Sequence, residues 1–232
     1  MNLETARREE DGAVLATTVW RTGPGMRAVS SALLGGGIGP VAWVMNAQVP
    51  GAYSRTDPVE HLREMAAGLG LAGPGVGMLT AASVDRTVRR EDGGVAVATT
   101  VGLRVPTWAA APEGATDPEL APIRLDGAPR PGTVNITVRV PAALTDAALV
   151  NAVVTATEAK TQALLEAGYP CTGTASDAIC VVAPEDGEPE PFAGPRSRWG
   201  ARIARAVHAA VHAGALDYTA VLRARAGNGP GR

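Results

Sequence analysis

The sequence has little of several residue types that define other classes of protein. Its two cysteines, Cys171 and Cys180, are too few for a disulfide framework, so we expect buried thiols. Aromatic residues make up 3% of the chain and no basic cluster is interleaved with them, which argues against nucleic-acid binding. No apolar run approaches the roughly 20 residues that cross a bilayer, and the N-terminus is polar and acidic. The sequence therefore predicts a cytoplasmic protein without a signal peptide or membrane anchor.

Lysine is the scarcest charged residue. The 21 basic residues include a single lysine, Lys160, and the net charge is −2. An excess of arginine is typical of GC-rich genomes, where arginine replaces lysine wherever a plain positive charge suffices. Arginine keeps its proton, whereas burial can shift a lysine toward the neutral amine. Two interpretations stay open here: chance, or a requirement for an amine at position 160.

The chain has enough apolar residues to form one core, since 46% of its 232 residues are hydrophobic. We predict an α/β fold with a single domain over residues 1–224, in which a mixed β-sheet is flanked by about three helices, and a disordered tail over 225–232. The strands are expected at 13–20, 27–33, 41–48, 75–80, 83–89, 94–103, 133–140 and 178–182. The helices are expected at 57–68, 145–168 and 197–214.

Local signals support these boundaries. Asp57 is expected to cap the first helix in a capping box with Glu60, with proline at the first helical position. Thr145 is the expected N-cap of the second helix, and Gly168 its C-terminal glycine. Residues 7–19 (RREEDGAVLATTV) closely resemble residues 89–101 (RREDGGVAVATTV), which indicates that both form a turn followed by a strand.

The segment 109–132 contains five prolines and several acids and has no apolar period. A segment of this length without secondary structure is usually functional or disordered. We therefore predict a lid or a flexible insert.

The helix expected at 145–168 breaks the usual separation of polar and apolar residues. At 100° per residue it has an apolar stripe, and Thr157, Lys160 and Thr161 fall inside it, with Glu158 at its border. The apolar members of the stripe are Leu149, Val150, Val153, Val154, Leu164 and Leu165. Buried polar groups need partners, and such breaks concentrate at functional sites. The alternative is a lysine whose stem packs while its ammonium reaches water.

Three other motifs have both a functional and a structural interpretation. The glycines Gly35, Gly36 and Gly37 follow a strand and either present backbone N–H groups to an anion or form a connector. Asn46 ends an apolar strand, either to contact substrate or to form a turn before Pro50. Residues 171–177 combine hydroxyls with one carboxylate, as a reactive or an ordinary polar loop.

A metal site is not expected. His208 and His212 lie four residues apart on one helix face, but no glutamate follows His208 and no third ligand is evident. This spacing fits a solvated helix face.

Taken in order, these motifs resemble the adenosylcobinamide amidohydrolase (CbiZ-type) family of corrinoid salvage. The resemblance covers residues 29–210, and its most specific pair is E-A-K-T followed by T-G-T-x-x-D-A. The resembling pieces are V-S-S-A-L-L-G-G-G (29–37), N-A-Q-V (46–49), G-M-L-T-A-A-S-V (77–84), T-V-N-I-T-V (133–138), T-A-T-E-A-K-T-Q-A-L (155–164), T-G-T-A-S-D-A-I (172–179) and F-A-G-P-R-S-R-W-G (192–200). The chain departs from the family after Val101, where G-L-R-V-P-T-W replaces a polar glycine-rich stretch, and at Ala175-Ser176.

The resemblance implies a C–N hydrolase that cleaves the amide joining aminopropanol to a corrin side chain of adenosylcobinamide and releases adenosylcobyric acid. The corrinoid substrate carries its own cobalt, so no further cofactor and no catalytic metal are implied. Neither a nucleic acid nor a membrane is expected as a partner, and the oligomeric state is open. The alternatives are a non-catalytic corrinoid-binding or regulatory module, and an amidohydrolase acting on a different corrinoid.

Amide hydrolysis needs an attacking oxygen, a base and donors for the developing oxyanion. Within the resemblance, Lys160 or Glu158 is the candidate base, and Asp177 is expected to orient a partner. The remaining candidates are Thr174, Ser30, Ser31 or a water as nucleophile; Asn46 and the N–H groups of Gly35, Gly36 and Gly37 as oxyanion donors; and Thr80, Asn135 and Thr172 as further substrate contacts.

Overall fold

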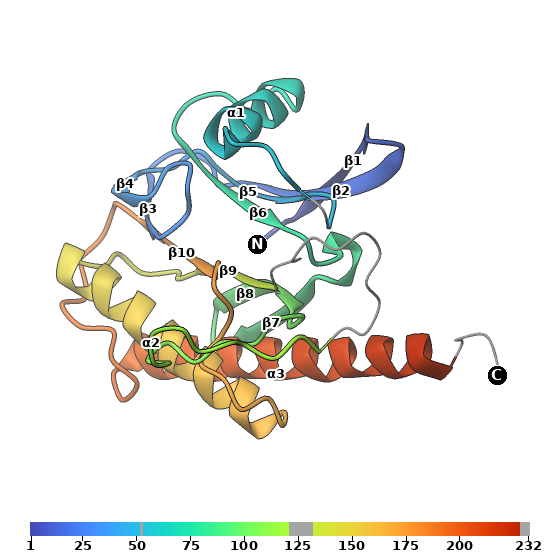
Figure 1. Ribbon diagram of the computed structural model, residues 1–232. Coiled ribbons are helices and arrows are strands. Elements are labelled where there is room, and N and C mark those ends of the chain that lie inside the picture. Colours follow the sequence, from blue (N-terminus) through green and yellow to red (C-terminus); the bar gives the residue numbers. More distant parts are fainter. Residues whose placement is uncertain (52, 121–131, 228–232) are drawn as a thin grey trace.

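The chain folds into four layers, a helix, two β-sheets and a pair of helices (Figure 1). The structure is a computed structural model that describes residues 1–51, 53–120 and 132–227. The mixed α/β class and the three expected α-helices are confirmed for these residues. The strands form two mixed sheets instead of one, with orders β1-β2-β5-β6 and β4-β3-β10-β9-β8-β7. Their bounds are β1 Glu4–Glu10, β2 Ala13–Arg21, β3 Met26–Ser30, β4 Gly37–Pro40, β5 Trp43–Gln48, β6 Gly75–Thr80, β7 Val88–Asp92, β8 Val95–Gly102, β9 Thr133–Arg139 and β10 Ala178–Pro184.

The two sheets contain the same arrangement of strands. In each, an antiparallel hairpin (β1–β2 or β7–β8) is followed by an antiparallel neighbour (β5 or β9) and then by a parallel strand (β6 or β10). A helix connects the parallel strands in both cases, α1 (Pro58–Gly68) and α2 (Asp146–Glu166). The two similar sequence segments form the two hairpins, which confirms that each is a turn followed by a strand. Strands β3 and β4 extend the second sheet beyond β10.

The ends of the two shorter helices follow different local rules. α2 begins as predicted, because Ala148 N–H donates to the Thr145 hydroxyl at 3.1 Å. Gly168 follows the helix with φ +87°, as a C-terminal glycine does. The predicted cap of α1 is wrong, because the Asp57 side chain makes no cap hydrogen bond and accepts instead from Arg55.

The last helix, α3 (Arg198–Gly227), is longer than predicted. The helix continues past Gly214, which faces β8. A Cβ at that position would collide with Val101. The glycine instead allows the helix backbone to pack closely on the sheet. The predicted tail is therefore wrong for residues 225–227, which are helical, and residues 228–232 lie outside the described residues.

Three smaller differences concern strands. The strands β1 and β4 were not expected, because β1 is polar and β4 is only four residues long. The strand expected at 83–89 is a short 3₁₀ turn, Val84–Arg86, followed by β7.

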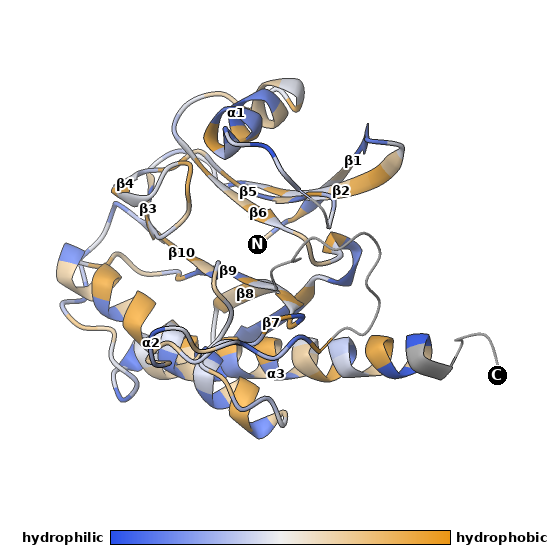
Figure 2. Ribbon diagram, in the orientation of Figure 1, coloured by the Kyte–Doolittle hydropathy of each residue, from blue (hydrophilic) through white to orange (hydrophobic). Residues whose placement is uncertain are grey.

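The layers are held together by three groups of buried residues. One lies between the six-stranded sheet and the helices α2 and α3, one lies between the sheets, and one lies between the four-stranded sheet and α1. In Figure 2, hydrophobic colour follows β2 and alternates with hydrophilic colour along α2 and α3, as expected for helices with one buried side. No helix among the described residues is both long and apolar enough to cross a membrane.

Candidate functional site

The residues of the best-defined motifs come together at one end of the two sheets, where β3 ends and β9 and β10 begin. The Ser30 hydroxyl at the end of β3 donates to the Ile179 carbonyl, and Ile179 N–H donates to the Ser31 hydroxyl. The Asn135 side chain in β9 donates to the Leu79 carbonyl near the end of β6. The motif segments are thus neighbours in space, although they lie far apart in sequence.

Lys160 is buried at this end, as helical phase predicted. Only 6% of the residue is exposed, and its ammonium Nζ donates to Asp177 Oδ2 at 2.5 Å. The ammonium therefore suits the role of a charged hydrogen-bond donor better than the role of a base.

Asp177 is the centre of the site. Besides Lys160, it accepts from the backbone N–H of Val134 at 2.8 Å and of Thr174 at 3.2 Å. The Thr174 hydroxyl also lies 2.5 Å from Asp177 Oδ1. One strand (β9), one helix (α2) and the 171–177 loop are held together by this carboxylate, so it orients both Lys160 and Thr174.

The Thr174 hydroxyl has two acceptors for its single proton. Asp177 Oδ1 lies on one side at 2.5 Å, and the Gly132 carbonyl lies on the other at 2.7 Å. The residue is half-buried, so its oxygen is not sealed in the core. A hydroxyl beside a carboxylate is a candidate nucleophile, because the carboxylate can accept its proton.

Gly173 lets the chain approach the ion pair closely. A Cβ added to it would overlap Asp177 Oδ2 and would lie 2.5 Å from Lys160 Nζ. The T-G-T motif therefore needs glycine at this position for steric reasons.

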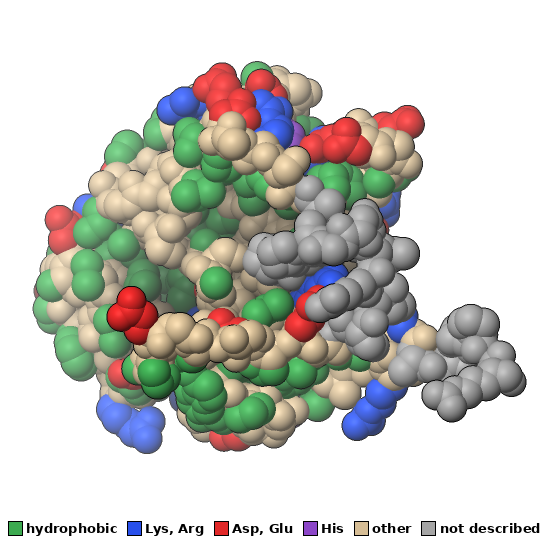
Figure 3. All heavy atoms as spheres, in the orientation of Figure 1, with side chains coloured by type: hydrophobic (Ala, Val, Ile, Leu, Met, Phe, Trp, Pro, Cys, Tyr) green, Lys and Arg blue, Asp and Glu red, His purple; other side chains and the backbone are tan. Residues whose placement is uncertain are grey.

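The remaining helix residues divide between interior and surface. Leu149 and Leu164 are buried as predicted, but Val150, Val154 and Leu165 are exposed, so that part of the stripe is wrong. The buried side is built mainly from alanines of α2, which let the α3 backbone come close. Figure 3 shows hydrophobic side chains gathered over α2.

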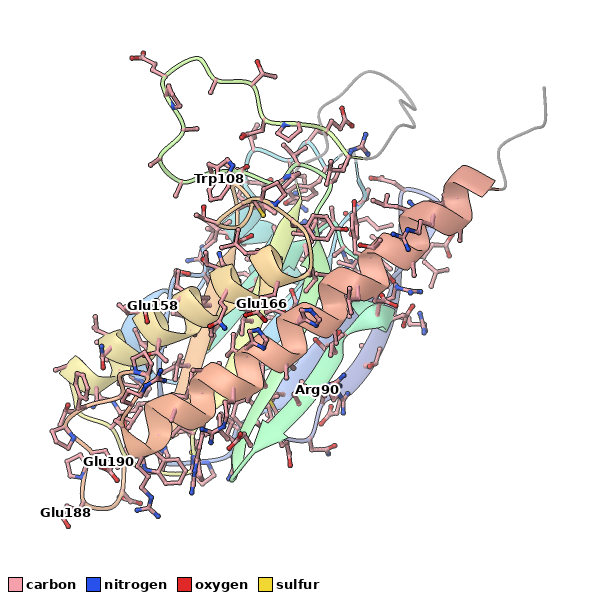
Figure 4. All side chains as sticks on the ribbon, turned by 90° about the horizontal axis from the view of Figure 1, so that it is seen from below. Arg90, Trp108, Glu158, Glu166, Glu188 and Glu190 are labelled. Carbon is pink, nitrogen blue, oxygen red and sulfur yellow. The ribbon has the colours of Figure 1, made fainter. Side chains whose placement is uncertain are left out.

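Glu158 and Thr157 lie on the exposed side of α2. Thr157 donates to the Val153 carbonyl one turn earlier, and Thr161 donates to the Thr172 carbonyl. Figure 4 shows Glu158 on the outer side of α2. The structure therefore does not bring Glu158 together with Lys160.

Asn46 and Asn135 lie between the sheets and bind each other. Asn135 Nδ2 donates to Asn46 Oδ1 at 2.8 Å, and Asn46 Nδ2 donates to the Thr100 hydroxyl at 3.0 Å. Within the two similar sheets, Asn46 pairs with Thr18 and Asn135 pairs with Thr100. A cavity of about 10 Å³ beside them has room for about one water molecule. The structure gives both amides a role in joining the sheets.

We expect Asn46→Ala to destabilise the protein. It removes the partner of the Thr100 hydroxyl and of one Asn135 N–H in the interior, which costs about 1–3 kcal/mol. Urea denaturation followed by circular dichroism measures the change. Val154→Ala, on the exposed side of α2, is the control and should change the free energy of unfolding by less than about 0.5 kcal/mol.

The glycine-rich loop closes a tight turn against the first sheet. A Cβ at Gly35 would collide with the Gly75 carbonyl, and one at Gly36 would collide with the Ala32 carbonyl. Gly37 begins β4. Thr80 is buried, and its hydroxyl accepts from Ala82 N–H at 3.0 Å. These contacts explain why glycine and threonine occur at these positions, and no ligand is needed to explain them.

Thr172 attaches the start of the predicted lid to the site. Its hydroxyl accepts from Ala109 N–H at 2.8 Å and donates to the Thr107 carbonyl at 3.1 Å. Leu120 N–H donates to the Arg104 carbonyl. Residues 121–131 of the expected lid lie outside the described residues, and its closure over substrate stays a prediction.

Sequence reasoning missed two contributors to the site. The Gly132 carbonyl accepts from both Thr174 and Ser176, and Thr133 shares a hydrogen bond with Ser176. The only available signal was their position, since Gly132 immediately precedes the T-V-N-I-T-V strand and Thr133 is its first residue.

Both cysteines are buried, as expected. Burial raises the pKa of the Cys180 thiol to about 12 and also raises the pKa of Cys171. Both thiols are therefore less ionised at pH 8 than a free cysteine, and the thiolate is the reactive form. We expect the folded protein to resist iodoacetamide at pH 8, whereas the urea-unfolded protein should gain two carbamidomethyl groups by mass spectrometry. Rapid labelling without denaturant would contradict this burial.

A cavity with polar lining lies elsewhere, away from Lys160. It has a volume of about 590 Å³ and lies between β1, α1, residue 50 and residues 53–55. Its polar groups pair with one another, since Arg8 donates to Glu10 at 2.8 Å and Tyr53 shares a hydrogen bond with His61 at 3.0 Å. We place the candidate site at Lys160, where the motif residues meet.

Comparison with known proteins gives a consistent result. The family model described as adenosylcobinamide amidohydrolase matches residues 2–223. A Methanosarcina mazei protein named adenosylcobinamide amidohydrolase is 33% identical over 197 residues, which cover 81% of this chain and 88% of that protein. A Halobacterium salinarum protein of the same name is 43% identical over 123 residues, which cover 52% of this chain and 50% of that protein.

Proposed function

The chain belongs to the adenosylcobinamide amidohydrolase family, and we propose that its Lys160–Asp177 site carries out the hydrolysis that the family name describes. The bond cleaved is the amide between aminopropanol and the corrin side chain. The products are adenosylcobyric acid and aminopropanol. An enzyme is favoured over a non-catalytic binding module.

The observation that supports this assignment is the chain of contacts from Thr174 through Asp177 to Lys160, with 2.5 Å at each step. In the proposed reaction, Thr174 Oγ1 attacks the amide carbon, and its proton passes to Asp177 Oδ1. The Lys160 ammonium donates to the oxyanion that develops on the amide oxygen. In this mechanism Asp177 is the base, and Lys160 is a hydrogen-bond donor instead of the expected base.

The C–N bond then breaks, and the proton held by Asp177 goes to the leaving amine. The acyl group remains on Thr174 as an ester, and a water molecule hydrolyses this ester. The water supplies the hydroxyl of the new carboxylic acid and returns a proton to Thr174. No redox change or additional reactant is needed.

The experiment is incubation of the purified protein with adenosylcobinamide, with products separated by liquid chromatography and identified by mass. We expect adenosylcobyric acid and aminopropanol in equal amounts. Tight binding without product after long incubation would favour a binding module instead. Thr174→Val should abolish turnover and Thr174→Ser should retain part of it; full activity of Thr174→Val would assign the attack to water.

The cofactor requirement, the cellular location, the partners and the substrate range are also proposals. The corrinoid supplies its own cobalt, and the proposed steps use protein groups without a separate cofactor or metal. A cytoplasmic location, the absence of a nucleic-acid partner, and the range of corrinoids accepted stay predictions. Assays with complete and incomplete corrinoids would define that range.

A further inference from the structure

Trp108 differs from the other tryptophans in its exposure. Trp20, Trp43 and Trp199 are 5%, 6% and 7% exposed and belong to the core. Trp108 is 47% exposed. It lies in G-L-R-V-P-T-W, the stretch where the sequence departs from the family pattern. Its ring is therefore the tryptophan face that a flat ligand ring could reach and stack on.

The backbone on both sides of Trp108 is fixed to the site. Thr107 N–H donates to the Gly173 carbonyl at 2.8 Å, and Thr172 N–H donates to the Thr107 carbonyl at 3.0 Å. On the other side, Ala109 N–H donates to the Thr172 hydroxyl at 2.8 Å. The ring is therefore carried by a segment with a defined position.

This anchoring places the ring at the edge of the catalytic centre. Gly173, which holds Thr107, is also the residue whose Cα adjoins the Lys160–Asp177 pair. Figure 4 shows Trp108 beside α2, at the base of the loop that leaves the body of the protein. A substrate with its amide at Thr174 would have its other parts within reach of this ring.

We propose that Trp108 forms a stacking subsite for a purine ring, the adenine of the adenosyl group, an assignment that rests on the proposed function. Adenine is the flat aromatic ring of this substrate, whereas the corrin periphery carries side chains that project above and below its plane. Offset stacking of a base on tryptophan is favourable and does not require hydrogen bonds. The residue then selects the adenosylated substrate without taking part in the chemistry.

The test is steady-state hydrolysis of adenosylcobinamide by Trp108→Ala and Trp108→Phe, with hydroxocobinamide as a competing ligand that lacks adenine. Loss of stacking should raise KM for adenosylcobinamide about tenfold in Trp108→Ala. The kcat value and the inhibition constant of hydroxocobinamide should change by less than about twofold. Trp108→Phe, which keeps a flat ring, should recover most of the affinity.

Phe192→Ala is the matched control, because Phe192 is another exposed aromatic residue, 59% exposed, outside the site loops. It should behave like the wild type. Unchanged KM in Trp108→Ala would overturn the proposal, and so would equal weakening of adenosylcobinamide and hydroxocobinamide, which would indicate contact with the macrocycle. Failure of the wild type to hydrolyse adenosylcobinamide would instead reject the proposed function itself.

Discussion

Asp177→Ala is expected to lower both the stability and the activity of the protein. It leaves the Lys160 ammonium buried without its counter-charge, at 8% side-chain exposure, and removes an acceptor from Thr174 and Val134. Breaking a buried ion pair by removing one partner costs about 3–5 kcal/mol. Urea denaturation should show this loss, and hydrolysis should fall at least about a hundredfold in the fraction that stays folded.

A double variant separates the two effects. Lys160→Met combined with Asp177→Leu removes both charges and fills the space with apolar side chains, which is often neutral for stability. We expect it to recover the part of the free energy of unfolding that the unpaired Lys160 charge costs, but none of the activity. Asp186→Ala, at an exposed position, is the control and should resemble the wild type. Recovery of activity in the double variant would show that the pair is only structural.

Gly173→Ala is expected to reduce hydrolysis at least about a hundredfold, because a methyl group there overlaps the Asp177 carboxylate and contacts the Lys160 ammonium. The two side chains cannot both keep their positions. The measurement is kcat for adenosylcobinamide hydrolysis, with circular dichroism to confirm the fold.

The control for this exchange is Gly39→Ala. An added Cβ at Gly39 of β4 meets no atom within 4 Å, and its φ is not in the left-handed region. Near wild-type activity is expected. If Gly173→Ala were as active as Gly39→Ala, the close approach of the loop to the ion pair would have no part in catalysis.

Helical phase and motif order anticipated much of this architecture. Phase placed Lys160 inside the protein, and the Thr145 and Gly168 signals gave both ends of α2, because these features depend on local geometry. The end of α3 could not be predicted in this way. Whether Gly214 stops a helix or packs against Val101 depends on a strand more than a hundred residues earlier.

The contacts of interior residues could not be predicted from local sequence either. Asn46 and Asn135 looked like separate substrate contacts, but their partners lie on the opposite sheet. The exposed Val150 and Val154 looked buried, because the sequence does not show that α3 packs on the alanine side of α2. Lys160 and Asp177 were separate candidates in the sequence, and their pairing could be seen only in the fold.

The most direct test of the account is the rate at which Lys160→Arg hydrolyses adenosylcobinamide, measured as adenosylcobyric acid formed by equal amounts of folded wild type and variant. Arginine keeps the positive charge, but its larger planar group does not fit the small buried space beside Gly173 and Asp177. We predict a loss of about a hundredfold or more in kcat. A variant with near wild-type kcat would contradict a requirement for the smaller Lys160 ammonium beside Asp177.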